Sequence, residues 1–460
     1  MSLNKKNILW LGLSTYLILS FFACYYFKER TAFTDISFHL FELLRTGEVV
    51  IQNFRFGAVF TQAFPLLAAK AGLPLTQVAV LYSLAFIILP FSLFLIILLG
   101  LKQEKMALVL LLFNTLMVTH TFYWTQSELP QGVAFAMLYF ALLNKTLEQE
   151  RPPDYYFGLV VPLVFLLVFV HPLMIFAVTY ALLFLALHHP SKRGFILYNL
   201  MGFALAYYIK TKVFITDYDS QAMGGLKNVF NLLPRFWSLE SSQRFLGYLW
   251  TDYFMLLAIF ATVSIGYFWQ KKWLQLVLLW LFSTGFLCIV NATYFQGAHQ
   301  FYIENQYLLL SLFVIFPFVF DFLKNIPSKP WSKVIIPLLL VTGLVRIGTS
   351  NGLYTTRIEW LRSFMEKTAS APSKKLVVEA AKVPKDTLML TWGSHYEFWL
   401  LSTMEKGVTY SVAIEEEKDE FKRAMNKNHS FITRWGDLEY NTLNPRYFVF
   451  PDSLSGYIRY

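Results

Sequence analysis

The sequence predicts an α-helical polytopic membrane protein with a small C-terminal α/β domain that faces water. Hydrophobic residues make up 56% of the 460 residues and charged residues only 15%, whereas a soluble domain carries charge on about 25% of its residues. Such a chain cannot cover a water-facing surface of normal size, so lipid must be part of its solvent. Long apolar runs, among them 8–27 and 78–101, approach the roughly 20 residues that cross the hydrocarbon core of a bilayer.

The distribution of basic residues predicts the orientation. Lys5 and Lys6 precede the first apolar run, and further basic pairs fall between alternate runs, whereas the connections at 124–131 and 291–305 contain no Lys or Arg. The positive-inside rule therefore predicts a cytoplasmic N-terminus in a bacterial inner membrane. Because the first run is longer than a signal-peptide core and no small-residue cleavage site follows it, we expect a retained anchor.

Counting from that end predicts about 11 spans, and an odd number of crossings places the C-terminus outside. The form of the run 156–187 is open, because His171-Pro172 lies at its middle. The proline either kinks a single tilted helix or marks a tight turn between two short crossings. The basic pair that follows it favours two crossings. The expected spans are residues 8–27, 76–100, 106–123, 130–144, 156–170, 173–187, 194–210, 247–269, 273–290, 306–323 and 334–348.

Nearly all of the chain that does not cross the membrane is expected on the outer side. The transmembrane domain is expected over 1–348, with periplasmic loops at 28–74 and 211–245, followed by a periplasmic α/β domain over 349–460. In this tail, branched and aromatic residues predict short strands and periodic patterning predicts helices, which together indicate a small, mostly parallel sheet. The expected strands are 376–378, 387–391, 408–412 and 447–450, and the expected helices are 395–404 and 413–426.

The first outer loop carries the main catalytic candidate. Asp35 lies a few residues beyond the first span, where a carboxylate can take a proton from a hydroxyl or bind a divalent cation. Arg30, His39 and Arg55 are candidates for holding a substrate or a phosphate, which Arg binds bidentately. Alternatively, Thr34 or Asp35 caps an amphipathic helix over 36–45 that ends at Gly47. The two interpretations are compatible, since such a helix would hold the carboxylate in place.

Further candidates lie at the outer ends of later spans. A charged side chain so close to hydrocarbon costs free energy, so Glu128 is a functional candidate. A helix start explains the residue equally well, with Ser127 as the cap and Glu128 in the first turn. His299 and Glu304 precede the tenth span, and Glu304 can face a cavity shared with Glu128. Arg346 lies near the end of the last span, where we expect snorkelling to the interface, with phosphate binding as the alternative.

Several classes of function lack support. The sequence contains no P-loop, GxGxxG, HExxH, CxxC or GxSxG pattern, and the basic residues are spread out rather than clustered, so neither a nucleotide nor a nucleic acid is expected. The two cysteines, Cys24 and Cys288, show no metal or redox spacing. His171 is interpreted as a satisfied turn residue, whereas Trp392, His395 and Glu397 at a strand-to-helix junction indicate a sugar or headgroup contact.

The layout resembles the GT-C superfamily of integral-membrane glycosyltransferases, in the bacterial branch that uses polyprenyl-phosphate-linked sugars. The similarity rests on a single first span, a long outer loop with an early Asp, an interfacial helix behind it and a soluble tail on the same side. The segments that carry it are Phe33-Thr34-Asp35-Ile36, Ser127-Glu128-Leu129 and Tyr302-Ile303-Glu304-Asn305-Gln306-Tyr307-Leu308.

This resemblance implies that Asp35 acts as the general base, or at a metal site, for the acceptor. Many relatives have a paired acidic motif in this loop, whereas here Ile36 follows Asp35 and the nearest other acid is Glu29, which favours a single-carboxylate mechanism. The donor would be a polyprenyl-phosphate sugar and the acceptor a glycan, a lipid or a protein. Arg30, Arg55 and Arg346 would be the candidate cations for the phosphate leaving group.

Two other classes of function remain open. A transporter or flippase for lipid-linked sugars would favour broken helices and polar groups in the middle of the membrane. A non-catalytic membrane scaffold would leave Asp35 and Glu128 without a connected cavity.

Overall fold

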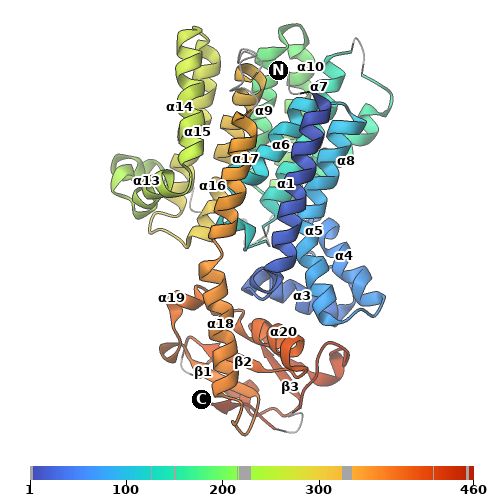
Figure 1. Cartoon of the computed structure of the whole chain (residues 1–460), viewed down its shortest axis with the longest axis vertical. Helices are drawn as coiled ribbons and strands as arrows, with labels where there is room; N and C mark the ends of the chain where they lie inside the picture. Colours follow the sequence, from blue (N-terminus) through green and yellow to red (C-terminus); the bar gives the residue numbers. More distant parts are fainter. Residues whose placement is uncertain are drawn as a thin grey trace.

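The computed structural model describes residues 4–125, 127–149, 152–214, 216, 229–323, 334–417, 419–451 and 455–460. These residues form a bundle of long helices with a small sheet unit at one end (Figure 1). The N-terminus lies at the opposite end of the bundle from the sheet unit. Two helices of the first loop, α3 (Thr34–Thr46) and α4 (Ala58–Lys70), lie at the end near the sheet unit.

The predicted apolar runs are helical over most of their length. The long helices of the bundle are α1 (Lys5–Tyr25), α5 (Leu75–Leu95), α6 (Glu104–Leu116), α7 (Glu128–Leu147), α8 (Tyr155–Val170), α9 (Met174–His188), α10 (Arg193–Val213), α14 (Phe254–Trp269), α15 (Trp273–Thr293), α16 (Gln300–Pro317) and α17 (Ile335–Thr349). Two short π-helical segments, η1 (Ile96–Gly100) and η5 (Phe318–Phe322), extend α5 and α16.

Fewer helices than the expected 11 are long and apolar enough to be counted as membrane spans. Among the described residues, five helices are long and apolar enough to cross a membrane, or up to seven if each of two bent helix pairs forms one span. The expected count of about 11 is therefore not confirmed. The physical reason is length: α8 has 16 residues and reaches ~24 Å at 1.5 Å per residue, short of the ~30 Å hydrocarbon core.

The proline at the middle of the run 156–187 separates two helices, as predicted. α8 ends at Val170 and α9 begins at Met174, with His171 extended between them at φ −163° and ψ 138°. A residue that precedes proline disfavours the helical conformation, which explains why the chain turns here rather than kinks.

The loop 28–74 is mostly helical rather than irregular. It contains α2 (Phe27–Thr31), α3 (Thr34–Thr46) and α4 (Ala58–Lys70). The predicted amphipathic helix is α3, which ends at Gly47 in a left-handed conformation at φ 70°. The expectation that Thr34 or Asp35 caps it is wrong, because the helix begins one residue earlier and both residues lie in its first turn.

α3 packs against the sheet unit through aromatic side chains. The ring of Phe41 lies 5.1 Å from Trp399 and 5.0 Å from Phe431, and Phe38 lies 5.3 Å from Tyr396. These contacts bury aromatic surface, which is the main source of stability at such a junction. α3 is therefore held between the bundle and the sheet unit.

The sheet unit contains a parallel sheet of order β2-β1-β5 and a separate antiparallel hairpin. Its elements are β1 (Lys375–Glu379), β2 (Ser411–Glu415), β5 (Ile458–Arg459), the hairpin strands β3 (Ser430–Thr433) and β4 (Gly436–Glu439), and the helices α18 (Gly352–Lys367) and α20 (Ser394–Lys406). The first predicted strand and the predicted helix 395–404 are confirmed, as is the parallel pairing. The predicted strand 408–412 lies too early, since β2 starts at its end.

Three other expectations in the tail are wrong. Residues 387–391 begin within a short helix, α19 (Lys385–Leu388). Met389, the residue that follows this helix, has a positive φ of 60°. Residues 447–450 form no strand and touch the segment before β2 through one backbone bond, from the Thr409 amide to the Val449 carbonyl at 2.6 Å. Residues 413–426 enter β2 and retain only α21 (Lys422–Met425) as helix. In the last case the pairing of β2 with β1 overrides the local helical pattern.

A close helix crossing gives the first testable prediction. A Cβ atom at Gly343 of α17 would lie 2.5 Å from the Thr115 carbonyl oxygen of α6, so a larger side chain must separate the two helices. We expect Gly343→Val to lower the free energy of unfolding by about 1–3 kcal/mol, measured by thermal unfolding of the purified protein. Gly285→Val on α15 is the control, because its Cβ would meet no atom within 4 Å. Equal melting temperatures for the two variants would contradict the prediction.

Candidate functional site

The first turn of α3 holds Asp35, half-buried, at the end of the bundle near the sheet unit. The indole Nε1 of Trp124 donates a hydrogen bond to Asp35 Oδ2 at 3.2 Å. Burial raises the pKa of Asp35 to about 6, the Trp124 hydrogen bond opposes that rise, and the charges of Glu128 and Glu397 add to it. A carboxylate with this pKa is mostly ionised at pH 7 and is well matched to general-base catalysis.

Glu128 and Arg55 form an ion pair beside Asp35. Arg55 Nη1 lies 2.6 Å from Glu128 Oε2, and the two side chains are 13% and 9% exposed. Ser127 caps α7 by accepting a hydrogen bond from the Leu129 amide at 3.2 Å, so the predicted cap is confirmed. The cap and the ion pair coexist, because the same turn that starts the helix presents Glu128 to Arg55.

His39 lies one helical turn after Asp35 and completes this group. Its side chain is buried, and its Nδ1 has no hydrogen-bond partner. Burial, followed by the charge of Arg55, lowers the pKa of His39 to about 4, so the imidazole is neutral at pH 7. The structure thus brings four of the predicted site residues together: Asp35, His39, Arg55 and Glu128.

His171 also approaches this group, from the turn between α8 and α9. Burial lowers its pKa well below the usual value, and the charges of Arg55 and Lys210 act in the same direction. Its Nδ1 accepts a hydrogen bond from the Leu173 amide at 3.2 Å, which confirms the interpretation as a satisfied turn residue.

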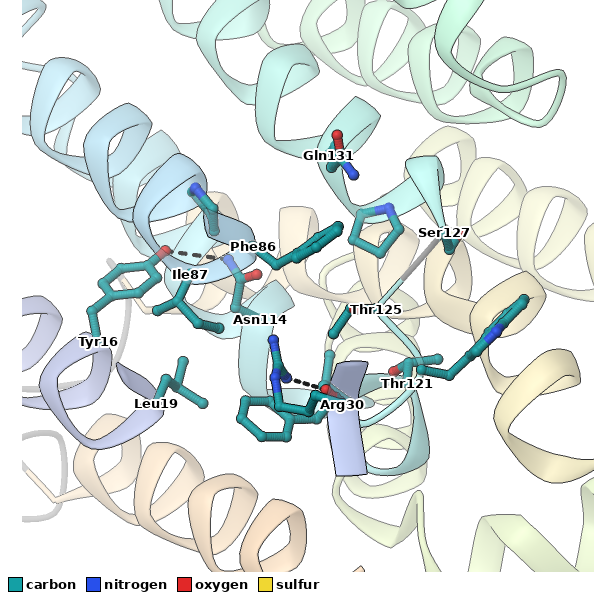
Figure 2. Close-up of a pocket in the computed structure, with 15 residues that line it drawn as sticks. Tyr16, Leu19, Arg30, Phe86, Ile87, Asn114, Thr121, Thr125, Ser127 and Gln131 are labelled. Carbon is teal, nitrogen blue, oxygen red and sulfur yellow. Dashed lines mark hydrogen bonds between the residues drawn. The ribbon is translucent and has the colours of Figure 1, made fainter. Parts of the chain in front are cut away.

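A cavity of about 650 Å³, counted with its open side, adjoins the Asp35 group (Figure 2). Trp124 lines it and also contacts Asp35, so the two features share one side chain. Its walls are largely apolar, but Thr125 Oγ1 and Gln131 Oε1 are buried without hydrogen-bond partners. The remaining lining residues are Tyr16, Leu19, Arg30, Phe86, Ile87, Pro90, Asn114, Val118, Thr121, Phe122, Ser127 and Pro130.

Arg30 places a positive charge on the wall of this cavity. Its Nε and Nη2 donate to the Ser83 hydroxyl and carbonyl at 2.8 and 3.1 Å, and its Nη1 donates to the Phe122 carbonyl. The guanidinium also lies over the Phe122 ring, 4.1 Å from its centroid. Burial lowers the pKa of Arg30 to about 9. These hydrogen-bond partners are all uncharged, so the guanidinium retains its attraction for an anion.

Glu304 does not share a cavity with Glu128, contrary to expectation. Its fully buried carboxylate accepts hydrogen bonds from the amides of Thr119 and Thr121 at 2.7 and 2.9 Å, from both their hydroxyls, and from Tyr253 at 3.0 Å. Because its oxygens bind the 119–121 turn, Glu304 has a structural role: it holds one wall of the cavity in place from α16.

The contacts of Arg346 and His299 are with residues other than Asp35. Arg346 does not snorkel, because it is buried with its guanidinium 5.8 Å from the ring centroids of Tyr253 and Phe254. Its Nη2 lies 3.6 Å from Asp252 Oδ1, and both terminal nitrogens lack hydrogen-bond partners. His299 stacks on Phe301 at 5.6 Å, and burial lowers its pKa.

The sheet unit supplies the cap that α3 lacks. Phe33 occupies the N-cap position and offers no side-chain hydrogen bond, but the Thr34 amide donates to Glu397 Oε1 of α20 at 2.5 Å. A carboxylate at this position also interacts favourably with the helix dipole. Gly393 permits the approach, since a Cβ there would lie 2.8 Å from the Thr34 Cα.

Arg357 of α18 neutralises this buried carboxylate. Arg357 and Glu397 form an ion pair with side chains 1% and 0% exposed, and Arg357 also donates to the Ala32 carbonyl at 3.0 Å and the Leu388 carbonyl at 3.1 Å. Burial raises the pKa of Glu397, and Arg357 opposes the rise. Glu397 therefore holds the backbone next to Asp35 and is closed to the sugar contact expected of it.

The other two residues of that junction differ in exposure. His395 is buried, and burial lowers its pKa to about 3, so it too is closed to a sugar. Trp392 is half-buried and lies 6.3 Å from Phe38 and 5.9 Å from the exposed Trp435 of the hairpin turn.

Sequence reasoning missed Trp124 and Arg357. A signal for Arg357 was present, because Tyr354, Arg357, Ile358 and Leu361 share one face of α18 at helical spacing, and a charge within an apolar stripe requires a buried partner. Trp124 carried no comparable signal.

Within the described part of the chain, no three His, Cys, Asp or Glu side chains come together as a metal site. No family model matches the chain, and neither a curated protein nor a solved structure is significantly similar to it.

Proposed function

We propose that this protein is a membrane glycosyltransferase that moves a sugar from a polyprenyl-phosphate donor to a hydroxyl group of its acceptor, with Asp35 as the general base. One observation carries the proposal. A half-buried carboxylate whose pKa is about 6 lies next to a largely apolar cavity with the Arg30 guanidinium on its wall, and Trp124 joins the two. A non-catalytic scaffold would not require this combination of base, cation and cavity.

The chemistry follows from these positions. The apolar walls between α1 and α5 suit the lipid chain of the donor, and Arg30 suits its phosphate. The acceptor oxygen forms a bond to the anomeric carbon as the bond from that carbon to the phosphate oxygen breaks, and the phosphate leaves with the electron pair. The acceptor proton moves to Asp35. Arg55, paired with Glu128, adds positive charge near the developing negative charge.

The orientation of the chain in the membrane determines how the two substrates reach the site. The N-terminus would be cytoplasmic and the sheet unit periplasmic in a bacterial inner membrane, so that the donor reaches the site from the bilayer and the acceptor from water. The acceptor would be a glycan, a lipid or a protein, and no nucleotide would take part. A divalent cation bound at Asp35 is the alternative to direct base catalysis.

The test is sugar transfer by the purified full-length protein in lipid, with a panel of polyprenyl-phosphate sugars. We expect Asp35→Asn to lower kcat by about 10²–10⁴-fold, the usual contribution of a general base. Glu42→Gln is the matched control. Glu42 lies on the same helix as Asp35, but its carboxylate pairs with Arg45 at an N–O distance of 2.5 Å. Equal activity of wild type and Asp35→Asn would refute the assignment of the base, and movement of an intact lipid-linked sugar across the bilayer without transfer would favour the flippase.

A further inference from the structure

The chain before α14 forms an arm beside the bundle. It comprises α12 (Val229–Leu232), a 3₁₀ segment η4 (Leu233–Ser238) and α13 (Glu240–Thr251). α13 meets α14 at an angle of 89°, and Figure 1 shows it projecting sideways from the end of α14 and α15 that is closer to the sheet unit. The sequence had indicated a water-exposed loop here, over 211–245.

The arm is fixed to the bundle along one face. Ser241 Oγ donates to the Asn291 carbonyl at 2.8 Å, and Asn291 Nδ2 donates to Ser242 Oγ at 3.1 Å. The ring of Phe245 packs 4.7 Å from Tyr307 of α16. These contacts set the position of α13, so the side chains on its other face have a defined direction.

The free face of the arm is aromatic. The exposed fractions of Phe230, Trp237 and Trp250 are 82%, 70% and 73%. Water-soluble proteins rarely expose such a group of large apolar side chains. Leu246 is also exposed and lies one helical turn before Trp250, so the two share a face of α13. Large aromatic side chains of this kind concentrate at the boundary between hydrocarbon and water, where tryptophan is enriched.

The helices that adjoin the arm also expose apolar side chains. α15 is a candidate span by itself, and α13 with α14 is one of the bent pairs. If α14 runs along the membrane normal, the 89° bend directs α13 along the membrane plane. The large apolar side chains exposed on α14 and α15 are Phe254, Ile265, Phe268, Trp269, Trp273, Leu274, Val277, Trp280 and Leu281.

We propose that the arm, residues 229–251, is an interfacial anchor that docks in the lipid headgroup region of the leaflet on the side of the sheet unit. Its occupant is the bilayer surface, because the arm exposes large aromatic side chains and is joined at a right angle to α14, whose exposed apolar side chains suit lipid. Amphipathic helices bind membranes in this way, with their apolar side buried ~5–10 Å into the boundary region. The arm thereby fixes the depth of the bundle in the bilayer, independently of any transfer reaction.

The test measures the surroundings of Trp250 in the full-length protein in phospholipid nanodiscs. Cys24 and Cys288 are replaced by Ser, and a nitroxide label is attached after Trp250→Cys or, in a second variant, after Trp237→Cys. Power-saturation spectroscopy then compares collisions with oxygen, which concentrates in lipid, and with a water-soluble nickel complex. The matched control is Trp435→Cys, since Trp435 is similarly exposed, at 67%, on the sheet unit.

We expect a higher ratio of oxygen to nickel collisions at positions 250 and 237 than at position 435. A ratio at both arm positions equal to that at 435 would overturn the proposal, because the arm would then lie in water. Low collision rates with both reagents would also overturn it, since they would mean that a protein surface or a second copy covers the arm. A variant that does not fold is replaced by the other arm position, and the outcome is judged from that one.

Discussion

Arg357→Met will lower the free energy of unfolding by about 3–5 kcal/mol, the usual cost of leaving a buried charge without its partner. Arg357 and Glu397 are almost fully buried, and their partners include the Thr34 amide and the Ala32 carbonyl. The substitution leaves the Glu397 carboxylate buried and unpaired between α3 and the sheet unit. Denaturant unfolding of the purified protein measures the loss.

The matched control is Arg362→Met on the same helix. Arg362 pairs with Glu405 at 2.6 Å, but the two side chains are 38% and 18% exposed, so water replaces the lost partner and we expect a cost of about 0–1 kcal/mol. Equal losses for the two variants would show that burial of the Arg357–Glu397 pair has no energetic importance.

A double variant separates stability from positioning. Arg357→Met combined with Glu397→Met removes both charges, and replacing a buried pair with apolar groups is often neutral for stability. We therefore expect the double variant to recover most of the lost stability. It still lacks the acceptor for the Thr34 amide, so sugar transfer should remain impaired. Full recovery of both properties would mean that the cap of α3 does not position Asp35.

The rate of sugar transfer will fall about tenfold between pH 7 and pH 5, because the proposed base must be ionised and the pKa of Asp35 is about 6. The sign follows from the chemistry of a carboxylate, which is deprotonated above its pKa and loses its capacity to accept a proton below it. The measurement is kcat against pH with saturating donor and acceptor. A rate that rises toward low pH would contradict the role of Asp35 as the base.

Trp124→Phe tests the origin of this profile. The Trp124 hydrogen bond lowers the pKa of Asp35, so its removal raises that pKa and should move the midpoint of the profile to higher pH. Trp10→Phe serves as the control, because Trp10 is exposed and lies near the start of α1. A midpoint that does not move in Trp124→Phe would mean that the profile reports another group.

Local sequence determined most of the helices and several of their ends. An apolar run in lipid must satisfy its backbone hydrogen bonds internally, which leaves the helix as the available form, and α1, α5 and α15 follow. Gly47 ends α3 and Ser127 begins α7 for reasons that lie within a few residues of each end. Glu128 could be chosen as a candidate because a charge near hydrocarbon is costly, and Asp35 because it lies a few residues beyond the first span.

Tertiary structure alone decided which of these residues meet. Glu397 caps α3 although it lies 363 residues later in the sequence, and Glu304 holds a turn that lies 185 residues earlier. No local pattern encodes contacts over such separations. The strands expected at 387–391 and 447–450 do not form, although their local propensity favours them. Arg30 and Trp124 become part of one site only because α2 and the turn before α7 pack around a common cavity. Residue type could thus be read along the chain, whereas burial, pairing and pKa depend on neighbours that folding brings together.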